Sequence, residues 1–446
     1  MSENNILHKS LKVRLYPDRE QSILLNKTFG CCRLIYNERL SEHIEWYNQN
    51  KDLPKERRSK FKGKLPKQLR EEKYEFLGEV IAEALINSQR NCEQSFNNFF
   101  SSLSGKRKGK KVGFPKFKSK KQHKDSFALC MISENLLDWN HRTIKIPKLG
   151  KVRFRHAEDK KGKWIDWFRT AVPKHITVSK NPAGEYWCSI LFEKQEDIYS
   201  TIKLDNATGL DFSPNSLYIN DLNEVAPNYR KAKQENKKKL TKLERRLARK
   251  QKGSKNREKA RIKLARHEQH IANIRRDYRE KETLRLVKTH DVTGVEDLNL
   301  IGMMRFSHNA KNYLDASWYR FVTRLEEKAK YNNCLVIRAD RFYPSSKTCN
   351  HCGYVKKDLK LSDRIWVCPE CGTEIIRDQN AALNLRENAI RTVVDSLKST
   401  LLLEQEEVMS VEGMEAEFCN GILCGVSYET ENLRSDFQEE AFKSLA

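Results

Sequence analysis

Alternation of polar and apolar residues near the start of the chain predicts a β-strand. In residues 10–15 every second side chain is apolar, which is the period of a half-buried strand. Pro17 ends this pattern, and residues 18–48 then carry apolar side chains at mostly helical spacing. A second helical block is expected over residues 73–103. The chain is therefore predicted to begin with one strand that leads into a helical segment.

Alternation returns between about residues 125 and 194. It recurs in residues 143–146, 151–154 and 175–178, and a mostly apolar run follows at residues 186–192. Each of these segments is long enough for a strand. An Asn-Pro-Ala-Gly turn at residues 181–184 joins the last two. Together with the first strand, these segments predict a small β-barrel interrupted by a helical insertion.

The second half of the chain predicts layers of helices and strands. Two short strands are expected at residues 210–212 and 217–219, followed by two long basic helices over 228–250 and 256–290. A strand at 292–295, a helix at 319–331 and a strand at 334–338 complete the pattern. This order is compatible with an RNase H-like sheet. Trp318 and Tyr319 are expected to pack in its core rather than to stack on bases.

The net charge of the chain favours nucleic acid as its partner. The 446 residues include 85 Lys and Arg against 60 Asp and Glu, a formal charge of +25, which suits a polyanion. No stretch approaches the ~18 consecutive apolar residues of a membrane helix, and the N-terminus lacks the apolar run of a signal peptide. We therefore expect a cytoplasmic protein. Collagen, coiled-coil rods, secreted disulfide scaffolds and integral membrane proteins are excluded.

The positive charge is unevenly distributed along the chain. Residues 391–446 hold 12 acidic and 4 basic residues, and the tail from residue 393 is expected to be poorly ordered. Residues 106–124 hold ten Lys and Arg with Phe114 and Phe117 among them. This loop and the basic helices are expected to contact phosphates. The residues predicted to bind nucleic acid are Lys106, Arg107, Lys108, Lys110, Lys111, Lys116, Lys118, Arg245, Arg246, Arg249 and Lys250.

Two Cys-x-x-Cys pairs predict a metal site. They are Cys349 with Cys352 and Cys368 with Cys371, separated by fifteen residues, and a glycine follows each pair. Each pair brings two thiolates to one side of a tight turn, and two such turns complete a tetrahedral Zn²⁺ shell. Because four thiolates leave no open position, the zinc is predicted to be structural rather than catalytic.

Three acidic residues lie where predicted strands end or a helix begins. Asp211 lies in the first short strand, Glu296 ends another, and Asp378 starts a helix after the second cysteine pair. Carboxylates at apolar strand ends are costly unless they are paired or bind a metal, and three of them would suit two Mg²⁺ ions. Each acid alone is a weak signal, since Asp and Glu are common at helix starts. The spacing of the residues does not by itself bring them together.

These motifs, in this order, resemble the TnpB family, the accessory "transposase" proteins of bacterial insertion sequences. The resemblance is carried by Gly209-Leu210-Asp211, by residues 295–303, by the run from Phe342 to Cys371, and by Arg377-Asp378-Gln379-Asn380-Ala381-Ala382. Residues 12–17 and 114–118 also resemble the family, so the likeness extends over about residues 8–390. Ser213 stands where the first family motif usually has glycine.

The resemblance implies an RNA-guided DNA endonuclease related to the CRISPR type V effectors. It implies a RuvC-like nuclease that cuts DNA beside a short motif by two-metal-ion chemistry, with Asp211, Glu296 and Asp378 as the catalytic, magnesium-binding residues and Asn380 assisting them. Guide RNA and target double-stranded DNA would be the partners, with one copy of the protein per RNA. The protein would be prokaryotic and associated with the nucleoid. The sequence leaves open a CRISPR type V miniature effector, a nuclease-inactive RNA-guided repressor and a true transposase.

The resemblance also implies a layout of domains. A wedge-type β-barrel at residues 1–17 and 125–200 would enclose a helical recognition insertion with a basic loop at 18–124. A RuvC-like domain at 201–342 and 373–392 would carry the zinc ribbon, residues 343–372, which binds target nucleic acid. An acidic, poorly ordered tail would follow at 393–446. The predicted fold class is multi-domain α+β, with a small β-barrel followed by an RNase H-like α/β domain.

Overall fold

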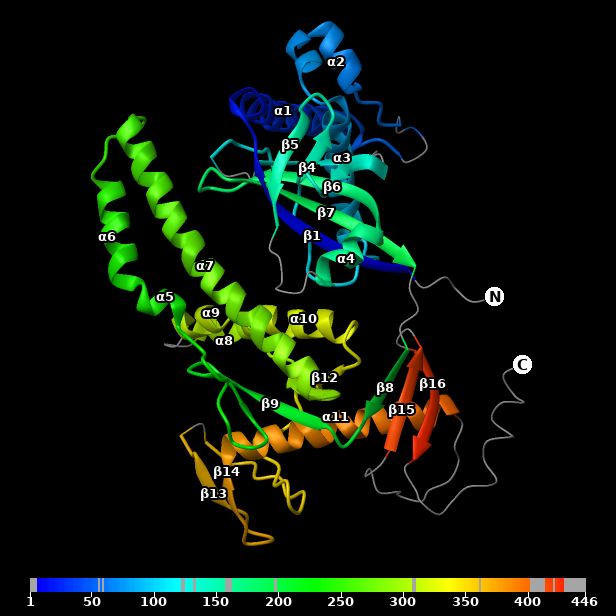
Figure 1. Ribbon diagram of the computed structural model, residues 1–446, viewed down its shortest axis with the longest axis vertical. Coiled ribbons are helices and arrows are strands. Elements are labelled where there is room, and N and C mark those ends of the chain that lie inside the picture. Colours follow the sequence, from blue (N-terminus) through cyan, green and yellow to red (C-terminus); the bar gives the residue numbers. More distant parts are fainter. Residues whose placement is uncertain are drawn as a thin grey trace. The chain divides into compact units, whose positions relative to one another are not determined.

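The computed structural model divides the chain into two units, Met1–Glu196 and Asp197–Ala446, of mixed α and β structure (Figure 1). It describes residues 6–54, 57, 60–121, 125–130, 134–156, 163–195, 199–306, 310–360, 362–401, 414–419 and 422–428. Within these ranges, no helix has both the length and the apolar character needed to cross a lipid bilayer.

The first unit is built on one antiparallel sheet of seven strands. They are β1 (Ile6–Tyr16), β2 (Asp125–Leu129), β3 (Leu137–Asp138), β4 (Thr143–Ile146), β5 (Gly150–Arg155), β6 (Val172–Lys180) and β7 (Tyr186–Gln195). Their order is β2-β6-β7-β1-β5-β4-β3. Leu11, Val13 and Leu15 of β1 are buried, which confirms the predicted alternation.

The predicted closure of this sheet into a barrel is wrong. In the described part of the chain β2 and β3 stand at opposite ends of the strand order and do not pair, so the sheet is a curled half-barrel. β3 has only two residues, and both pair with β4, so it is too short to extend the sheet toward β2. The alternation of side chains predicts strands well, but it carries no information about closure.

Helices cover this sheet and share its core. They are α1 (Arg19–Asn50), α2 (Pro66–Glu72), α3 (Ala82–Leu103) and α4 (Lys163–Thr170), with short 3-10 helices at Glu75–Glu79 and Glu134–Leu136. Asp18 caps α1 by accepting a hydrogen bond from the Gln21 amide at 2.8 Å, and the Gln21 side chain accepts one from the Asp18 amide. The helical block predicted over 73–103 is interrupted, because the backbone at Val80 and Ile81 is extended.

The second unit contains a sheet of four strands in the order β10-β9-β11-β12. The strands are β9 (Ala207–Ser213), β10 (Leu217–Asn220), β11 (Val292–Glu296) and β12 (Leu335–Ala339). β10 runs antiparallel to β9, whereas β9, β11 and β12 are parallel. Between β10 and β11 lie α5 (Ala232–Glu235), α6 (Lys237–Ala248) and α7 (Lys255–Thr289). Between β11 and β12 lie α8 (Leu300–Phe306), α9 (Ala310–Ala316) and α10 (Trp318–Ala329).

The two aromatic residues at the start of α10 differ in burial. Trp318 is 2% exposed and packs in the core, as predicted. Tyr319 is 65% exposed, so its predicted burial is wrong. Successive residues on a helix point about 100° apart. When the apolar face of α10 buries Trp318, the side chain of Tyr319 therefore points outward.

Helix α11 (Arg377–Leu401) packs against β9 and β11, and Figure 1 shows it beside β9. Gly209 and Gly294 pair with each other across these two strands. A Cβ added at Gly209 would lie 1.8 Å from the carbonyl oxygen of Ala382, and one added at Gly294 would lie 2.1 Å from that of Leu385. Any side chain at either position would therefore push the helix off the sheet.

Two smaller sheets complete the second unit. β13 (Ile365–Val367) and β14 (Glu374–Ile376) form a hairpin that leads into α11, and β8 (Tyr199–Lys203) pairs with β15 (Met414–Cys419), which pairs with β16 (Ile422–Tyr428). The end of α11 and these last strands lie where the sequence predicted a poorly ordered tail. Residues 414–419 alternate in polarity, which is typical of a strand. The acidic composition of the segment led instead to the prediction of a poorly ordered tail. The rest of the tail lies outside the described residues.

The packing of α11 on the glycine pair gives a first prediction. Gly294→Ala is expected to lower the free energy of unfolding of the second unit by about 1–3 kcal/mol, because the methyl group would clash with backbone that cannot move away freely. Thermal or urea unfolding of the purified protein measures the change.

Gly30→Ala is the matched control, since Gly30 lies in α1 and, apart from the nearby backbone of its own helix, no atom lies within 4 Å of the added carbon. It is expected to be neutral or slightly stabilising. Equal stability of the two variants would contradict the close approach of α11.

Candidate functional site

Two of the three predicted acids are brought together by strand register. Val295 of β11 pairs with Leu210 of β9 in a parallel ladder. The next residues on the two strands, Glu296 and Asp211, are therefore neighbours at the same edge of the sheet. Both side chains are partly buried. The carboxyl ends of parallel strands are where open α/β sheets place their ligands.

The third acid reaches this edge from α11. Asp378 lies in the first turn of the helix, and the packing of Ala382 and Leu385 on the two glycines fixes where that turn lies. The amide groups of a first turn favour negative charge. The structure thus brings all three predicted acids to one region of the second unit.

The three carboxyl groups influence one another electrostatically. Burial raises the pKa of Asp211 well above its usual range, and the charges of Glu296 and Asp378 raise it further. Burial also raises the pKa of Glu296, although hydrogen bonds from the Ser345 hydroxyl and the Phe212 amide oppose this shift. Like charges held together in a poorly solvated place are costly without a cation, so the site is suited to positive ligands.

An arginine that the sequence did not single out lies at this site. Arg364 precedes β13 and donates to both carboxylate oxygens of Asp378, at 3.1 and 3.4 Å. Its side chain is 69% exposed. The two residues lie fourteen positions apart in the sequence, and nothing in the spacing distinguishes this arginine from others in a basic chain. Only the fold of the hairpin brings it to Asp378.

Asn380, predicted to assist the acids, turns its side chain toward the cysteine segment. Its Nδ2 donates to the carbonyl of Thr348 at 2.7 Å, and its Oδ1 accepts from the amide of Asn350 at 2.9 Å. Both ends of the side-chain amide are thus occupied by backbone. Asn380 therefore holds another segment in place rather than reaching toward the carboxylates.

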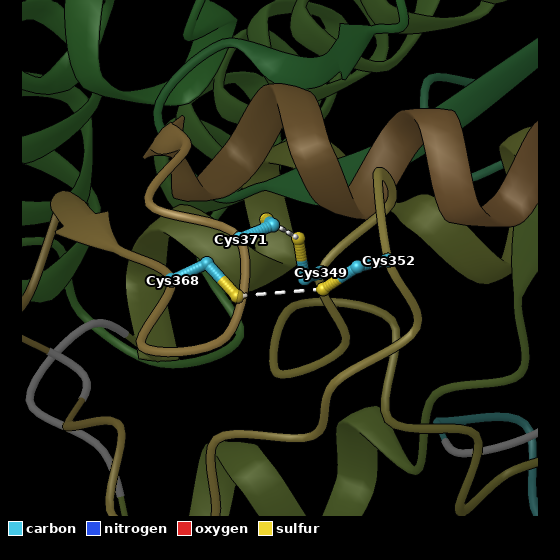
Figure 2. A group of neighbouring side chains, drawn as sticks. All are labelled: Cys349, Cys352, Cys368 and Cys371. Carbon is cyan, nitrogen blue, oxygen red and sulfur yellow. Dashed lines mark hydrogen bonds between the residues drawn. The ribbon is translucent and has the colours of Figure 1, made fainter.

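The four predicted cysteines converge from two loops (Figure 2). The sulfurs of Cys349 and Cys371 lie 3.7 Å apart, and those of Cys352 and Cys368 lie 3.5 Å apart. All four lie within 4.8 Å of one another. Hydrogen bonding with Thr373 lowers the pKa of Cys371 to about 6, whereas burial raises the pKa of Cys349. The thiolate that a metal requires is therefore favoured at Cys371 but not at Cys349.

The geometry and donor set of these cysteines fit a metal ion. After each pair a glycine takes a positive φ, 79° at Gly353 and 70° at Gly372, and its amide donates back to the first cysteine of the pair. Among the described residues, the four cysteines are the one group of His, Cys, Asp and Glu gathered closely enough to hold an ion. The three acids are near one another but not gathered to that degree.

The predicted nucleic-acid-binding residues lie mainly on the surface. Ten of the eleven are exposed, in the loop that follows α3 and at the end of α6, and Lys118 is partly buried. Lys118 differs, because its ammonium lies 3.5 Å from the centre of the Tyr36 ring and burial lowers its pKa. Its amide also donates to Asn37 at 2.8 Å. Lys118 therefore anchors the end of the basic loop to α1.

Three family models match the chain. One described as a helix-turn-helix domain matches residues 4–52, and one described as a probable transposase matches residues 189–307. A third, the Cas12f1-like TNB domain, matches residues 318–385 and so includes all four cysteines and Asp378. The models thus cover parts of both units.

Relatives match over most of the chain. A protein of Streptomyces pristinaespiralis named "Putative RNA-guided DNA endonuclease" is 31% identical over 84% of this chain and 88% of its own length. "Putative RNA-guided DNA endonuclease InsQ" of Escherichia coli is 28% identical over 91% of this chain and 98% of its own. The solved Cas12f1-sgRNA-target DNA complex covers 85% of this chain and 99% of the matched chain, at 12% identity and a TM-score of 0.46. The two relatives and the three family models confirm the predicted resemblance, and the chain belongs to the TnpB family.

Proposed function

We propose that the protein is an RNA-guided DNA endonuclease of IS605-type transposons. One observation carries the proposal: Asp211, Glu296 and Asp378 meet at one sheet edge in a chain whose relatives bear that name. A binding protein without nuclease activity has no need to hold three carboxylates together at a cost in stability.

The topology of the second unit supports a RuvC-like, RNase H-type domain. A parallel pair of strands, β9 and β11, lies at the centre of the sheet, with β10 antiparallel at one side and β12 parallel at the other. In this proposal the half-barrel of the first unit is the wedge, and α1–α3 with the basic loop form the recognition part. The segment with the four cysteines, residues 343–372, is the element that binds target nucleic acid.

Asp211, Glu296 and Asp378 would hold divalent ions of the Mg²⁺ kind, since hard cations take oxygen ligands. Such ions, when bound, would activate water and stabilise the leaving oxygen of a phosphodiester. The residues themselves orient the ligands: Ser345 and the Phe212 amide hold Glu296, and the start of α11 holds Asp378. Arg364 adds an exposed guanidinium beside Asp378, placed to meet a DNA phosphate.

Removing any one acid tests this function. We expect each of three substitutions to slow DNA cleavage by at least roughly 100-fold: Asp211→Asn, Glu296→Gln and Asp378→Asn. Replacing a residue that only hydrogen-bonds to a metal ligand already lowers activity by about 10- to 100-fold. RNA binding is expected to persist, because neutralising a carboxylate removes repulsion from phosphate. Cleavage of target DNA by the protein purified with its own RNA measures the effect.

Asp277→Asn is the control, since this acid is exposed on α7 and paired with Lys281. Full cleavage by any of the three variants would overturn the assignment of that acid. A wild-type complex that binds target DNA without cutting it would favour the repressor instead. Sequencing the bound RNA separates the remaining alternatives: RNA from the transposon end supports the proposal, and repeat-derived RNA supports a CRISPR effector.

The cysteine cluster is proposed to hold structural zinc. Cys368→Ser is expected to lower the bound zinc and the melting temperature, because the segment has few apolar residues to hold it together. Elemental analysis and thermal unfolding measure both quantities. Cys130→Ser, at an exposed cysteine outside the cluster, is expected to change neither. Zinc content unaffected by Cys368→Ser would refute the site.

The basic end of α6 is proposed to bind phosphate. Replacing Arg245, Arg246 and Arg249 by alanine is expected to weaken nucleic-acid binding and to make it less dependent on salt. The slope of log affinity against log salt should fall by about 0.7–0.9 for each phosphate that is no longer neutralised. Binding titrations at several salt concentrations give this slope.

Arg261→Ala is the control for the triple variant, because Arg261 on α7 is already paired with Glu258. It is expected to leave the slope close to that of the wild type. An unchanged slope in the triple variant would contradict phosphate binding by the end of α6.

A further inference from the structure

Two buried asparagines of α11 hold the first cysteine loop from the side of the helix. Asn380 and Asn384 are 4% and 3% exposed and lie one turn apart. Asn380 bonds the carbonyl of Thr348 and the amide of Asn350. These are the two chain neighbours of Cys349. The position of Cys349 is thus fixed from both sides by one helical side chain.

The second asparagine carries the connection toward the acids. Asn384 Nδ2 donates to the carbonyls of Ser345 and Thr348, at 2.7 Å in each case. Its Oδ1 accepts from the side chain of Asn350 at 3.2 Å. Ser345 is itself 4% exposed, and its hydroxyl donates to Oε1 of Glu296 at 2.9 Å. A continuous chain of hydrogen bonds thus joins the neighbours of Cys349 to Glu296.

This chain of bonds leaves its members little freedom. A buried amide with both its donor and its acceptor in use has one orientation, since rotating it would leave backbone groups unpaired. The Ser345 hydroxyl is fixed in the same way, because Asn384 holds its backbone. Its bond to one oxygen of Glu296 orients the carboxylate and determines which lone pairs remain for a cation.

We propose that Ser345 is a positioning residue for Glu296, and that Asn380 and Asn384 form a clamp that couples the cysteine site to the carboxylate site. The metal held by the cysteines would then be needed for DNA cleavage although it takes no part in the chemistry. This inference rests on the proposed function, because it assumes that Glu296 binds a divalent cation.

The first test separates orientation of Glu296 from general stability. Mn²⁺ binding to the RNA-bound protein is measured by calorimetry, together with zinc content and the kcat and KM of cleavage. Ser345→Ala is expected to weaken Mn²⁺ binding and to lower kcat by roughly 10- to 100-fold, with KM for DNA and zinc content unchanged. Ser345→Thr keeps the hydroxyl and is expected to restore both.

Ser362→Ala is the matched control, because this exposed serine of the same segment bonds to the neighbouring Asp363 and not to an acid of the site. It is expected to behave as the wild type. Wild-type Mn²⁺ affinity in Ser345→Ala would overturn the positioning role, as would a loss in Ser345→Thr as large as that in Ser345→Ala.

The second test addresses the coupling. Asn384→Ala is expected to release zinc to a chelator faster and to weaken Mn²⁺ binding together, because it removes the link between the two sites. Asn388→Ala, one turn further along α11, is the control and is expected to change neither. Chelation of zinc from the wild type is also expected to weaken Mn²⁺ binding, and unchanged Mn²⁺ binding after zinc loss would overturn the coupling.

Asp211→Asn distinguishes failure of the inference from failure of the proposed function. If this variant loses Mn²⁺ binding while Ser345→Ala keeps it, the positioning role is wrong and the metal site stands. If Asp211→Asn also keeps wild-type Mn²⁺ binding, the proposed carboxylate site itself is wrong, and the inference falls with it.

Discussion

The close approach of α11 to two adjacent strands is the constraint on which the second unit depends. At Gly209 and Gly294 no side chain separates the strands from the helix, and Ala381 and Ala382 keep the facing surface of the helix small. Backbone packed against backbone has little freedom to shift. The first turn of α11 is therefore held at the strand ends, and its later turns present two asparagines to the cysteine segment.

The site collects negative charge and partly compensates for it. Burial and neighbouring carboxylates raise the pKa of Asp211, so the ionised form is disfavoured where it would be needed to bind a cation. Arg364 offsets Asp378, and the Ser345 hydroxyl offsets Glu296. Of the three carboxylates, Asp211 is the one whose negative charge is least compensated by neighbouring groups. A cation at this place would relieve the repulsion that the protein alone leaves in part unbalanced.

The sequence predicted local features of the structure and missed those that depend on tertiary packing. Alternation along β1 predicted its buried face, and the cysteine spacing predicted a metal cluster, because both are local features. The meeting of Asp211 and Glu296 depends on the register of two strands about 80 residues apart, which no local pattern determines. The resemblance to a family supplied that link. Barrel closure, the burial of Tyr319 and the position of Arg364 depend on tertiary packing in the same way.

The cysteine segment is part of the carboxylate site rather than an appendage beside it. Arg364 of this segment donates a hydrogen bond to Asp378. Ser345, nearer the start of the segment, donates one to Glu296. The segment's own apolar core is small, consisting of Trp366 and Ile375 with two of the cysteines, so burial alone holds it weakly. The metal proposed for the four sulfurs and the asparagines of α11 must therefore provide the rigidity. A segment held in this way can place two side chains on two acids with the accuracy that metal-ion chemistry requires.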